Sequence, residues 1–262
     1  MSYTISNDRF NTSAVVLDYQ EGVIPDLGED GGFKSNGWYE FSRATKGRNA
    51  LRQTLRGSVR AYTMLSTPNS AVYPKCGIGI EAGASGSLES SSYLSPMGYG
   101  YVYGYVPGLM STHGIRLSMM HQTKLNDAPF GQPIVNVMPR GLSNNGELFS
   151  YLAIMNTSMT KLSADYACPV YIGDLSIGGS MFSIKRLVIN PHFDYMSAGE
   201  DSLYSAGAEF ILDMNSILTL EWPCSFGLTC SYNGGRSFDK LASETGINIS
   251  RYYVGPTFNV TF

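Results

Sequence analysis

The sequence predicts an all-β fold, an antiparallel up-and-down transmembrane β-barrel of about twelve strands, within a range of roughly 10 to 16. Three observations predict it. Apolar and polar side chains alternate over long runs, the connections between runs are short on one side and long on the other, and the chain ends in an alternating strand on Phe262. A period of two gives a strand one apolar and one polar face.

The composition fits many strands joined by turns. Of the 262 residues, 43% are hydrophobic and only 15% charged, with 29 Gly, 18 Tyr and 12 Phe. Gly favours turns and aromatic residues favour strands. No window approaches the roughly 18 consecutive apolar residues that a membrane-spanning helix needs, which excludes a helical membrane protein. The net charge of −3 and the pI near 5.6 do not indicate a nucleic-acid partner.

The N-terminal residues, MSYTISNDRF, have neither the basic region nor the apolar core of a secretion signal. Because an outer-membrane protein needs such a signal, we expect the chain to be the C-terminal part of a longer precursor. We expect residues 1–262 to form a single barrel domain, in which residues 1–35 have the least regular pattern.

The alternation is clearest from Leu218 to Asn233, where apolar side chains occupy the even positions and mostly small or polar ones the odd positions. The run exceeds the roughly 9 to 11 residues that a tilted strand needs to cross a bilayer. We therefore assign its even face to lipid. The predicted lipid-facing residues are Leu220, Trp222, Phe226 and Leu228. In the final strand, Arg251 to Phe262, the even face is likewise assigned to lipid and the odd face to the lumen.

The polar faces of these strands carry ionisable residues that we predict to form a network in the barrel lumen. They are Arg186, His192, Asp194, Glu209, Asp213 and Glu221. Enclosed charges hydrogen-bond one another, so the network needs no catalytic role. The alternative is a hydrolase in which His192 and Asp194 act with a Ser from another strand.

Motifs for catalysis or metal binding are missing from the sequence. It contains no GxSxG, P-loop or HExxH motif. The four cysteines show no CxxC pair and no nearby His at metal spacing, so a zinc site is not expected. We predict no catalytic residue, no cofactor and no metal site.

Two columns of side chains have open interpretations. Arg52, Arg56 and Arg60 share one face of the run from Asn49 to Leu65, either as a solvated face of an ordinary sheet or as a basic column in the lumen. Tyrosines alternate from Tyr99 to Tyr105. They are either a sugar-binding platform or, as is more usual, aromatics that pack across glycines of a neighbouring strand or lie in an interfacial girdle.

The connections set the position of each strand. A long connection at residues 123–146 leads to a predicted strand from Leu148 to Met155, and Asp213 to Ile217 reads as a tight turn before the clearest run. Counting back from the C-terminus, the 123–146 connection lies on the short-turn side if Leu148 to Met155 is a strand. It lies on the long-loop side if that segment is not a strand.

The C-terminal strand resembles the assembly signal of bacterial outer-membrane proteins, in which a Gly precedes aromatic and hydrophobic residues at alternate positions. The matching residues are Gly255, Phe258, Val260 and Phe262. Five segments also resemble the C-terminal barrel of Bacteroidota outer-membrane proteins, which a WD-repeat-like propeller often precedes. They are YPKCG at 73–77, YVPGL at 105–109, HGIRL at 113–117, MPRG at 138–141 and DYACPVYIGDLSIGG at 165–179.

The closing strands, among them FSIKRLVINPHFDY and LTLEWPCSFGLTCSYN, are similar to those of the bacterial surface antigen superfamily, which includes outer-membrane insertases. This resemblance implies that Arg140 and Gly141 belong to a loop that folds into the lumen. It also implies a place in the bacterial outer membrane, with outer-membrane lipid and the barrel assembly machinery as partners. An N-terminal periplasmic propeller or partner proteins would complete the assembly.

These observations lead to one main expectation and two alternatives. The main expectation is an integral outer-membrane β-barrel that acts as a membrane anchor, or as a narrow or plugged pore, in envelope transport or protein assembly. The alternatives are an outer-membrane barrel hydrolase and a secreted β-sandwich carbohydrate-binding module.

Overall fold

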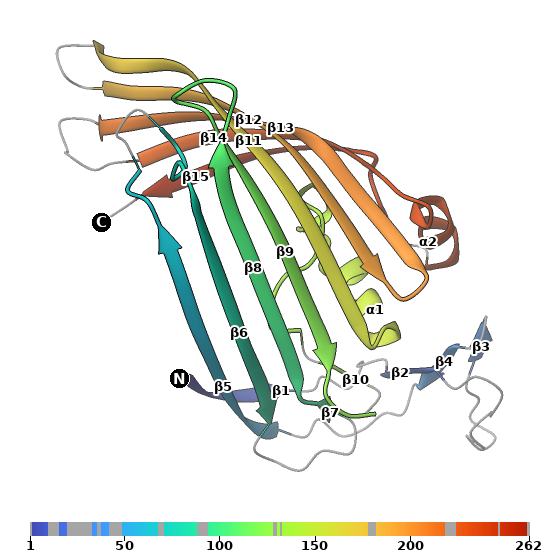
Figure 1. Cartoon of the computed structure of the whole chain (residues 1–262). Helices are drawn as coiled ribbons and strands as arrows, with labels where there is room; N and C mark the ends of the chain where they lie inside the picture. The colour runs from blue at the N-terminus through green and yellow to red at the C-terminus, as the bar shows by residue number, and fades with distance from the viewer. Residues whose placement is uncertain are drawn as a thin grey trace.

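One antiparallel sheet of ten strands dominates the fold (Figure 1). The computed structural model describes residues 2–9, 16–19, 33–35, 38–41, 49–67, 71–87, 94–127, 130–131, 133–177, 182–217, 224–245 and 247–260. In spatial order the strands of the sheet are β1 (Ser2–Arg9), β5 (Asn49–Met64), β6 (Gly77–Ser87), β8 (Met97–Pro107), β9 (Gly114–Lys124), β11 (Ser158–Ile177), β12 (Phe182–Ala198), β13 (Asp201–Ile217), β14 (Cys224–Gly234) and β15 (Tyr252–Val260). Two smaller sheets contain β2 (Val16–Tyr19), β4 (Trp38–Phe41) and β3 (Phe33–Ser35), and β7 (Leu94–Ser95) with β10 (Phe130–Gly131).

The order of strands across the large sheet follows their order in the chain, and all its pairings are antiparallel. The prediction of an antiparallel up-and-down β fold is therefore confirmed. Within the described ranges the sheet is not closed, because β1 and β15 form its edges and each pairs on one side only. Its ten strands are fewer than the twelve or so expected and equal the lower bound of the predicted range.

Leu148 to Met155 was predicted as a strand, and this prediction was wrong. These residues belong to the helix α1 (Gly146–Met155). Leu148 and Leu152, four residues apart, lie on one face of the helix and are fully buried. The side chain of Asn145 caps the helix by accepting a hydrogen bond from the Leu148 backbone N–H at 3.0 Å. A short apolar run fits both the helical period of 3.6 residues and the strand period of two. Asn145, a favourable helix-capping residue, is the signal that indicates a helix here.

The predicted tight turn at Asp213 to Ile217 was also wrong. These residues continue β13, where Asp213 lies opposite Arg186 and Ile217 opposite Phe182. Asp213 is polar because it faces a basic partner across the sheet and not because the chain turns there. The connection from β13 to β14 falls in residues 218–223, outside the described residues. At the opposite end of β13, the β12–β13 hairpin turns after Ala198, where Gly199 has a φ of +56°, a conformation that favours glycine.

The two ends of the sheet differ in their connections. At the helix end, β9 leads to β11 through residues 125–157, with η1 (Arg140–Leu142) and α1, and β14 leads to β15 through residues 235–251, with α2 (Phe238–Thr245). At the turn end, residues 65–76 join β5 to β6, residues 108–113 join β8 to β9, and β15 finishes. The short turn from β12 to β13 is an exception, because it lies at the helix end. The connection predicted at 123–146 thus lies on the long-loop side, as expected if Leu148 to Met155 is not a strand.

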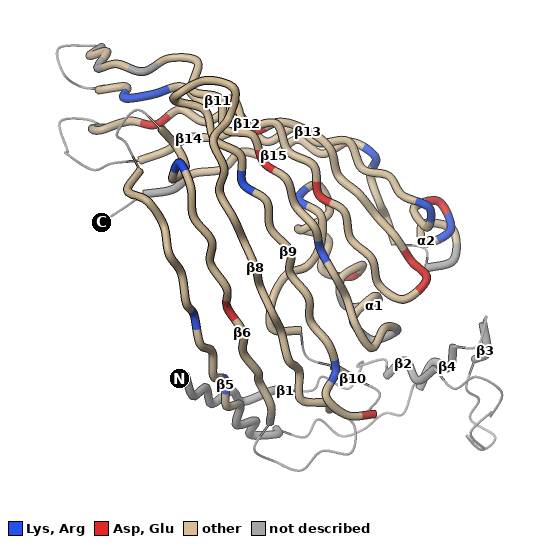
Figure 2. Tube along the Cα trace, viewed as in Figure 1, with Lys and Arg blue, Asp and Glu red and all other residues tan. Residues whose placement is uncertain are grey.

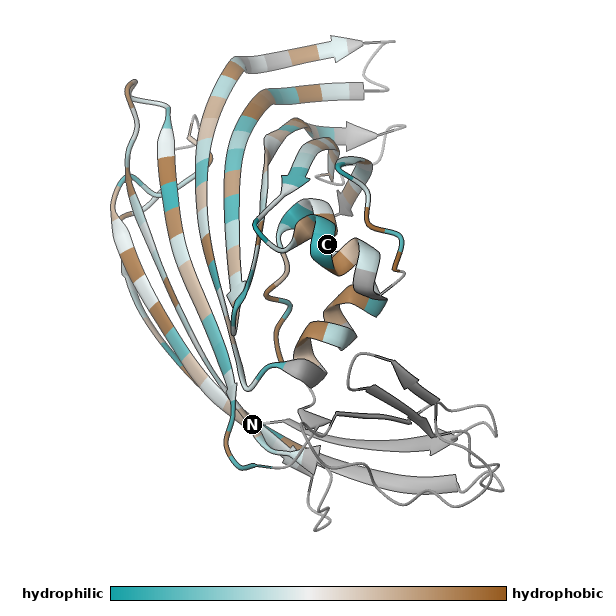
Figure 3. Ribbon diagram, turned by 90° about the vertical axis from the view of Figure 1, so that its right-hand side faces the viewer, coloured by the Kyte–Doolittle hydropathy of each residue, from teal (hydrophilic) through white to brown (hydrophobic). Residues whose placement is uncertain are grey.

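The helices cover one face of the sheet, here called the inner face, which is the concave side in Figure 3. A core of apolar side chains lies between them and the strands at the helix end. Its buried members are Val137, Met138, Leu142, Leu148, Leu152, Ala153, Met159, Met196, Ala198, Leu203, Phe238 and Leu241. Among the helices in the described ranges, none has the length and apolar character needed to cross a membrane.

Candidate functional site

The outer, convex face of the sheet exposes large apolar side chains. Phe226 and Leu228, both predicted to face lipid, point outward from β14 with exposed fractions of 41% and 43%. Leu220 and Trp222 lie outside the described residues. The colours of Figure 3 alternate along the strands, as the period of two requires.

The strand register aligns these exposed side chains into rows. One row crosses five neighbouring strands, β6, β8, β9, β11 and β12, at positions that lie directly opposite one another. Its members are Ile80, Val102, Met119, Leu162 and Tyr195, with exposed fractions between 38% and 52%. Figure 2 shows long stretches without charge along the strands. The outer face is therefore a continuous apolar surface.

A second row on the outer face is aromatic and lies towards the helix end. Its ring centroids are 6.1 Å apart from Phe193 to Tyr204, 6.5 Å from Tyr204 to Tyr232 and 5.6 Å from Tyr232 to Tyr252. The four rings come from the successive strands β12 to β15. They form a band across the sheet at one level.

The inner face has the opposite character, because polar side chains are buried there. The residues of this kind on β9 and on β11 to β14 are Gln122, Asp165, Asn190, His192, Asp194, Ser205, Thr229, Ser231 and Asn233, each at most 6% exposed. Buried polar groups need hydrogen-bond partners. The segment that carries η1 supplies many of them.

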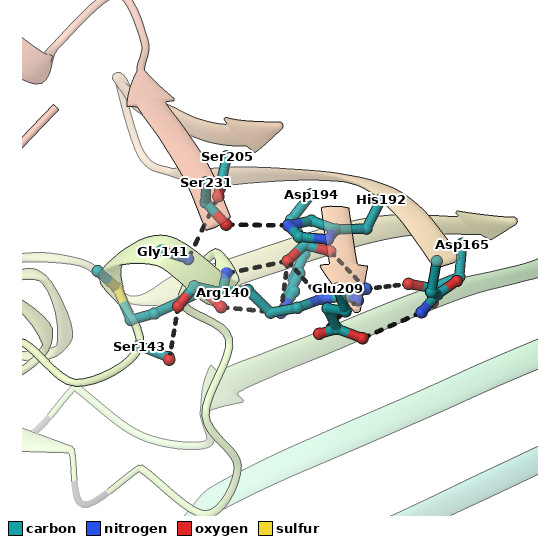
Figure 4. Close-up of polar contacts among 12 residues, drawn as sticks. Arg140, Gly141, Ser143, Asp165, His192, Asp194, Ser205, Glu209 and Ser231 are labelled. Carbon is teal, nitrogen blue, oxygen red and sulfur yellow. Dashed lines mark hydrogen bonds and ion pairs between the residues drawn. The ribbon is translucent and has the colours of Figure 1, made fainter. Parts of the chain in front are cut away.

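Arg140, in η1, is the centre of this inner face (Figure 4). Its guanidinium Nε donates to Asp194 at 3.1 Å, its Nη1 donates to Glu209 at 3.2 Å, and its Nη2 forms an ion pair with Asp165. The three carboxylates belong to β11, β12 and β13. Burial alone would lower the pKa of Arg140, but the charges of Asp194, Asp165 and Glu209 outweigh it and raise that pKa above its ordinary value.

Gly141 brings the η1 backbone against the sheet. Its N–H donates to the Ser205 hydroxyl at 3.2 Å, and its carbonyl accepts from the Asn233 side-chain amide at 3.2 Å. A Cβ at this position would lie 2.1 Å from Asn233 Oδ1. Only glycine permits this approach. Arg140 and Gly141 thus lie on the polar inner face, against the strands that carry the predicted network residues.

The predicted network falls into three groups. Asp194 and Glu209 meet at Arg140, whereas Arg186 and Asp213 form a separate ion pair of 2.5 Å nearer the turn end. His192 shares a hydrogen bond of 3.1 Å with Ser231 on β14. Glu221 lies outside the described residues.

The predicted network omitted Asp165, Lys161 and Asn190, which belong to the same inner face. Lys161 lies 3.5 Å from Asp194, and Asn190 donates to Glu209 at 3.0 Å. The sequence contains the pattern that identifies Lys161 and Asp165. They occupy odd positions of β11, opposite in direction to the outward-facing Leu162 and Tyr166 at even positions. Only the apolar members of that alternation were used.

Two tyrosines of the column, Tyr99 and Tyr103, pack on glycines of the neighbouring strand β6, as one of the two interpretations expects. Tyr103 and Tyr99 are 8% and 6% exposed. A Cβ at Gly79 would lie 2.3 Å from the Tyr103 ring, and one at Gly83 would lie 2.6 Å from the Tyr99 ring. The tyrosine rings of β8 therefore fill the space left by glycines of β6.

The basic column lies on the inner face of β5. Arg60 pairs with Glu81 at 2.5 Å, and the Arg56 guanidinium lies 5.5 Å from the centroid of the Tyr99 ring. The side chain of Arg52 lies outside the described residues. Arg60 is nevertheless exposed, with 58% of its side chain accessible, so the column lies on the inner face and is solvated there.

His192, Asp194 and Ser231 do not have the arrangement of a catalytic triad. His192 Nε2 reaches Ser231, but His192 Nδ1, where an acidic residue would orient the ring, has no hydrogen-bond partner among the described residues. Asp194 instead binds Arg140 and Lys161. Ser231 and His192 are only 6% and 5% exposed. The described part of the chain contains no cluster of three His, Cys, Asp or Glu side chains suited to a metal ion.

The matched residues of the C-terminal strand are partly described. Phe258 lies on the outer face with its ring centroid 4.6 Å from that of Phe226, and Gly255 is buried. Val260 ends β15, and Phe262 lies outside the described residues. Comparison of the chain with family models, curated proteins and solved structures found no match. The resemblances to outer-membrane families therefore stay predictions.

Proposed function

We propose that the chain forms the wall of an outer-membrane β-barrel whose inner face is filled, and that it acts as a sealed or narrow membrane anchor. The observation that carries this proposal is the inverted distribution of side chains. Large apolar residues are exposed on the outer face while charged and polar residues are buried on the inner face. A sheet in contact with lipid needs this distribution.

Water is a poor solvent for the outer face. Transfer of apolar surface out of water is favourable by roughly 25 cal/mol per Å². Monomeric soluble proteins rarely expose contiguous apolar patches beyond a few hundred Å². In a soluble sandwich a second layer would cover the apolar face. Here α1, α2 and η1 all lie on the inner face, over an apolar core at the helix end and the polar network beside it, so lipid is the cover that fits the outer face.

Strand length and the aromatic row agree with a bilayer. The strands β11, β12 and β13 have 20, 17 and 17 residues, against the roughly 9 to 11 needed to cross. The row from Phe193 to Tyr252 would mark the interface at the helix end, where Tyr prefers to lie. Both long connections would then lie on the outer side, with the chain ending at the periplasmic side.

A filled inner face favours an anchor over an open pore. The segment with η1 and α1 lies against the sheet and is tied by Arg140 to three neighbouring strands. Barrels of about eight to ten strands enclose little more than their own side chains. In the proposed barrel, the remaining edges β1 and β15 pair with each other or with additional strands. The barrel assembly machinery and a periplasmic propeller would be its partners in the envelope.

Heat-modifiable migration in detergent tests the proposal directly. The chain is refolded into detergent micelles and into liposomes, and its migration is compared with and without boiling. A membrane barrel migrates faster before boiling and resists extraction from the liposomes at alkaline pH. A monomer that stays in water without detergent and leaves the liposomes would overturn the proposal and favour the secreted β-sandwich. Conductance across planar bilayers then distinguishes a sealed anchor from an open pore.

A further inference from the structure

A cysteine, a histidine and a tyrosine meet at the turn end of the sheet. Cys168 and Tyr166 lie two residues apart on β11 and therefore share one face of that strand, and His113 is the last residue of the connection from β8 to β9. The Nε2 of His113 lies 3.6 Å from the Sγ of Cys168, and its Nδ1 lies 2.7 Å from the hydroxyl oxygen of Tyr166. A thiol, a base and a group that orients the base are thus in contact, in that order.

The surroundings of the imidazole hold it in place. The Tyr166 hydroxyl accepts a hydrogen bond from the Leu109 N–H at 3.4 Å, and its ring lies edge-on to the imidazole, with 5.4 Å between the centroids. Two backbone hydrogen bonds close the connection, one from Gly108 to the His113 carbonyl and one from His113 to the Met110 carbonyl. The ring nitrogen that faces the sulfur is therefore in a fixed position to take the thiol proton.

Cys168 lies where other molecules have access to the strand. It is the first residue of β11 beyond the pairing with β9, which ends where Ala167 lies opposite Gly114. Cys168 is partly exposed, and Val170 and Tyr171, which follow it, are 57% and 40% exposed. A small reagent can therefore approach the thiol from outside the sheet.

The other cysteines lie too far away to form a disulfide with Cys168. Cys76 immediately precedes β6, and Cys224 and Cys230 belong to β14, so each is three strands away from β11 in the sheet. Three strand spacings of about 4.8 Å come to roughly 14 Å, whereas the Cα atoms of a disulfide lie within about 7 Å of each other. Any disulfide of Cys168 is therefore made with another molecule.

We propose that Cys168 is a modification site that reacts with small disulfides by thiol–disulfide exchange. The thiol proton moves to His113 Nε2, and the Cys168 sulfur attacks one sulfur of the incoming disulfide. A mixed disulfide forms while the old S–S bond breaks, so Cys168 is oxidised and the second sulfur is reduced. That sulfur leaves as a thiolate and takes up the proton. The site lies at the periplasmic side of the proposed barrel, where disulfides persist, but its reactivity does not depend on the barrel.

Reaction of the folded full chain with oxidised glutathione at pH 7 tests this proposal. Mass spectrometry of peptides follows the mixed disulfide at each cysteine over time. A free thiol is only about 3% ionised at pH 7, so a neighbouring base raises the rate by up to about thirtyfold, less the nucleophilicity that a more acidic thiol loses. We expect Cys168 to react about tenfold faster than Cys76, although Cys76 is the more exposed of the two.

His113→Gln should lower the rate at Cys168 about tenfold, to that of Cys76, because the base is removed. Tyr166→Phe should lower it a few-fold, since the base stays but loses the hydrogen bond that orients it. Equal rates at Cys168 and Cys76 in the parent chain would overturn the proposal. A rate at Cys168 that His113→Gln leaves unchanged would overturn it as well.

Two controls separate the chemistry from the fold. His121→Gln changes a histidine of β9 that contacts the Thr160 hydroxyl at 2.8 Å, and it should leave the rate at Cys168 unaltered. Cys224 is only 5% exposed, so its modification reports any unfolded fraction. If His113→Gln does not fold, Tyr166→Phe decides, and a rate equal to that of the parent chain would overturn the proposal. None of these outcomes affects the lipid-insertion test, so the two proposals fail separately.

Discussion

Arg140 donates two hydrogen bonds to a single oxygen of Asp194, one from its backbone N–H at 2.9 Å and one from its guanidinium Nε at 3.1 Å. The backbone and the side chain of one connection residue are thus fixed to the same carboxylate on β12. Asp165 and Glu209 bind the other guanidinium nitrogens. Asp194 therefore fixes η1 through both the backbone and the side chain of Arg140, in addition to the contacts that Gly141 makes with Ser205 and Asn233.

Replacing Arg140 with Ala should destabilise the fold strongly, because it leaves three carboxylates close together without their shared cation. Breaking a buried ion pair in this way typically costs about 3 to 5 kcal/mol. The free energy of unfolding in urea measures the change. Arg251→Ala is the control, since Arg251 pairs with an Asp239 side chain that is 81% exposed, and such surface pairs contribute about 0 to 1 kcal/mol. Equal losses in the two variants would contradict the central role of Arg140.

Gly141→Ala should lower stability by about 1 to 3 kcal/mol, because the new methyl group would collide with Asn233 and push η1 off the sheet. Gly146→Ala is a matched control five residues later. A Cβ at Gly146 meets nothing within 4 Å, and alanine favours the helix that begins there. Thermal unfolding of both variants measures the difference. A Gly141→Ala chain as stable as Gly146→Ala would show that η1 does not lie against Asn233.

Adjacent residues of β15 test the assignment of the two faces. Phe258 points outward with 59% of its surface exposed, whereas Thr257 lies on the inner face over Gly227. If the outer face meets lipid, Phe258→Asp should reduce folding into liposomes by up to about 2 kcal/mol, since a carboxylate costs less on the lipid face than the roughly 2 to 4 kcal/mol of an Arg or Lys at the midplane. Thr257→Asp should be mild. Similar yields of heat-modifiable protein from both variants would refute the assignment.

The glycines beneath the tyrosine column should be sensitive to a single methyl group. Gly79→Ala should cost about 1 to 3 kcal/mol, because the buried Tyr103 ring occupies the space that the methyl group needs. Gly100→Ala, on the outer face of β8, should be nearly neutral, since no described atom lies within 4 Å of the place that its methyl group would take. Urea unfolding of the two variants makes the comparison. A stable Gly79→Ala chain would mean that Tyr103 packs elsewhere.

The alternation of side chains predicted most strands of the C-terminal half and their faces, but it made a strand of Leu148 to Met155 and ended β13 too early, at Asp213. Phe226 and Leu228 point outward, and Asp194 and Glu209 point inward, because a fixed period of two leaves each side chain only one face once its neighbours are assigned. The same rule applied to Lys161 and Asp165 would have added both residues to the network.

Other features depend on contacts that a linear pattern does not contain. The helix α1 is stabilised by packing of Leu148 and Leu152 on the sheet, and the run itself fits either period. The pairing of His192 with Ser231, and of Arg186 with Asp213, depends on the register between strands. The cluster at Cys168 forms only when the β8–β9 connection lies against β11.

Arg140 belongs to a connection, whereas Asp165, Asp194 and Glu209 belong to three neighbouring strands of the wall. Filling of the interior and completion of the wall are then a single folding event, because neither the arginine nor the carboxylates can be buried alone.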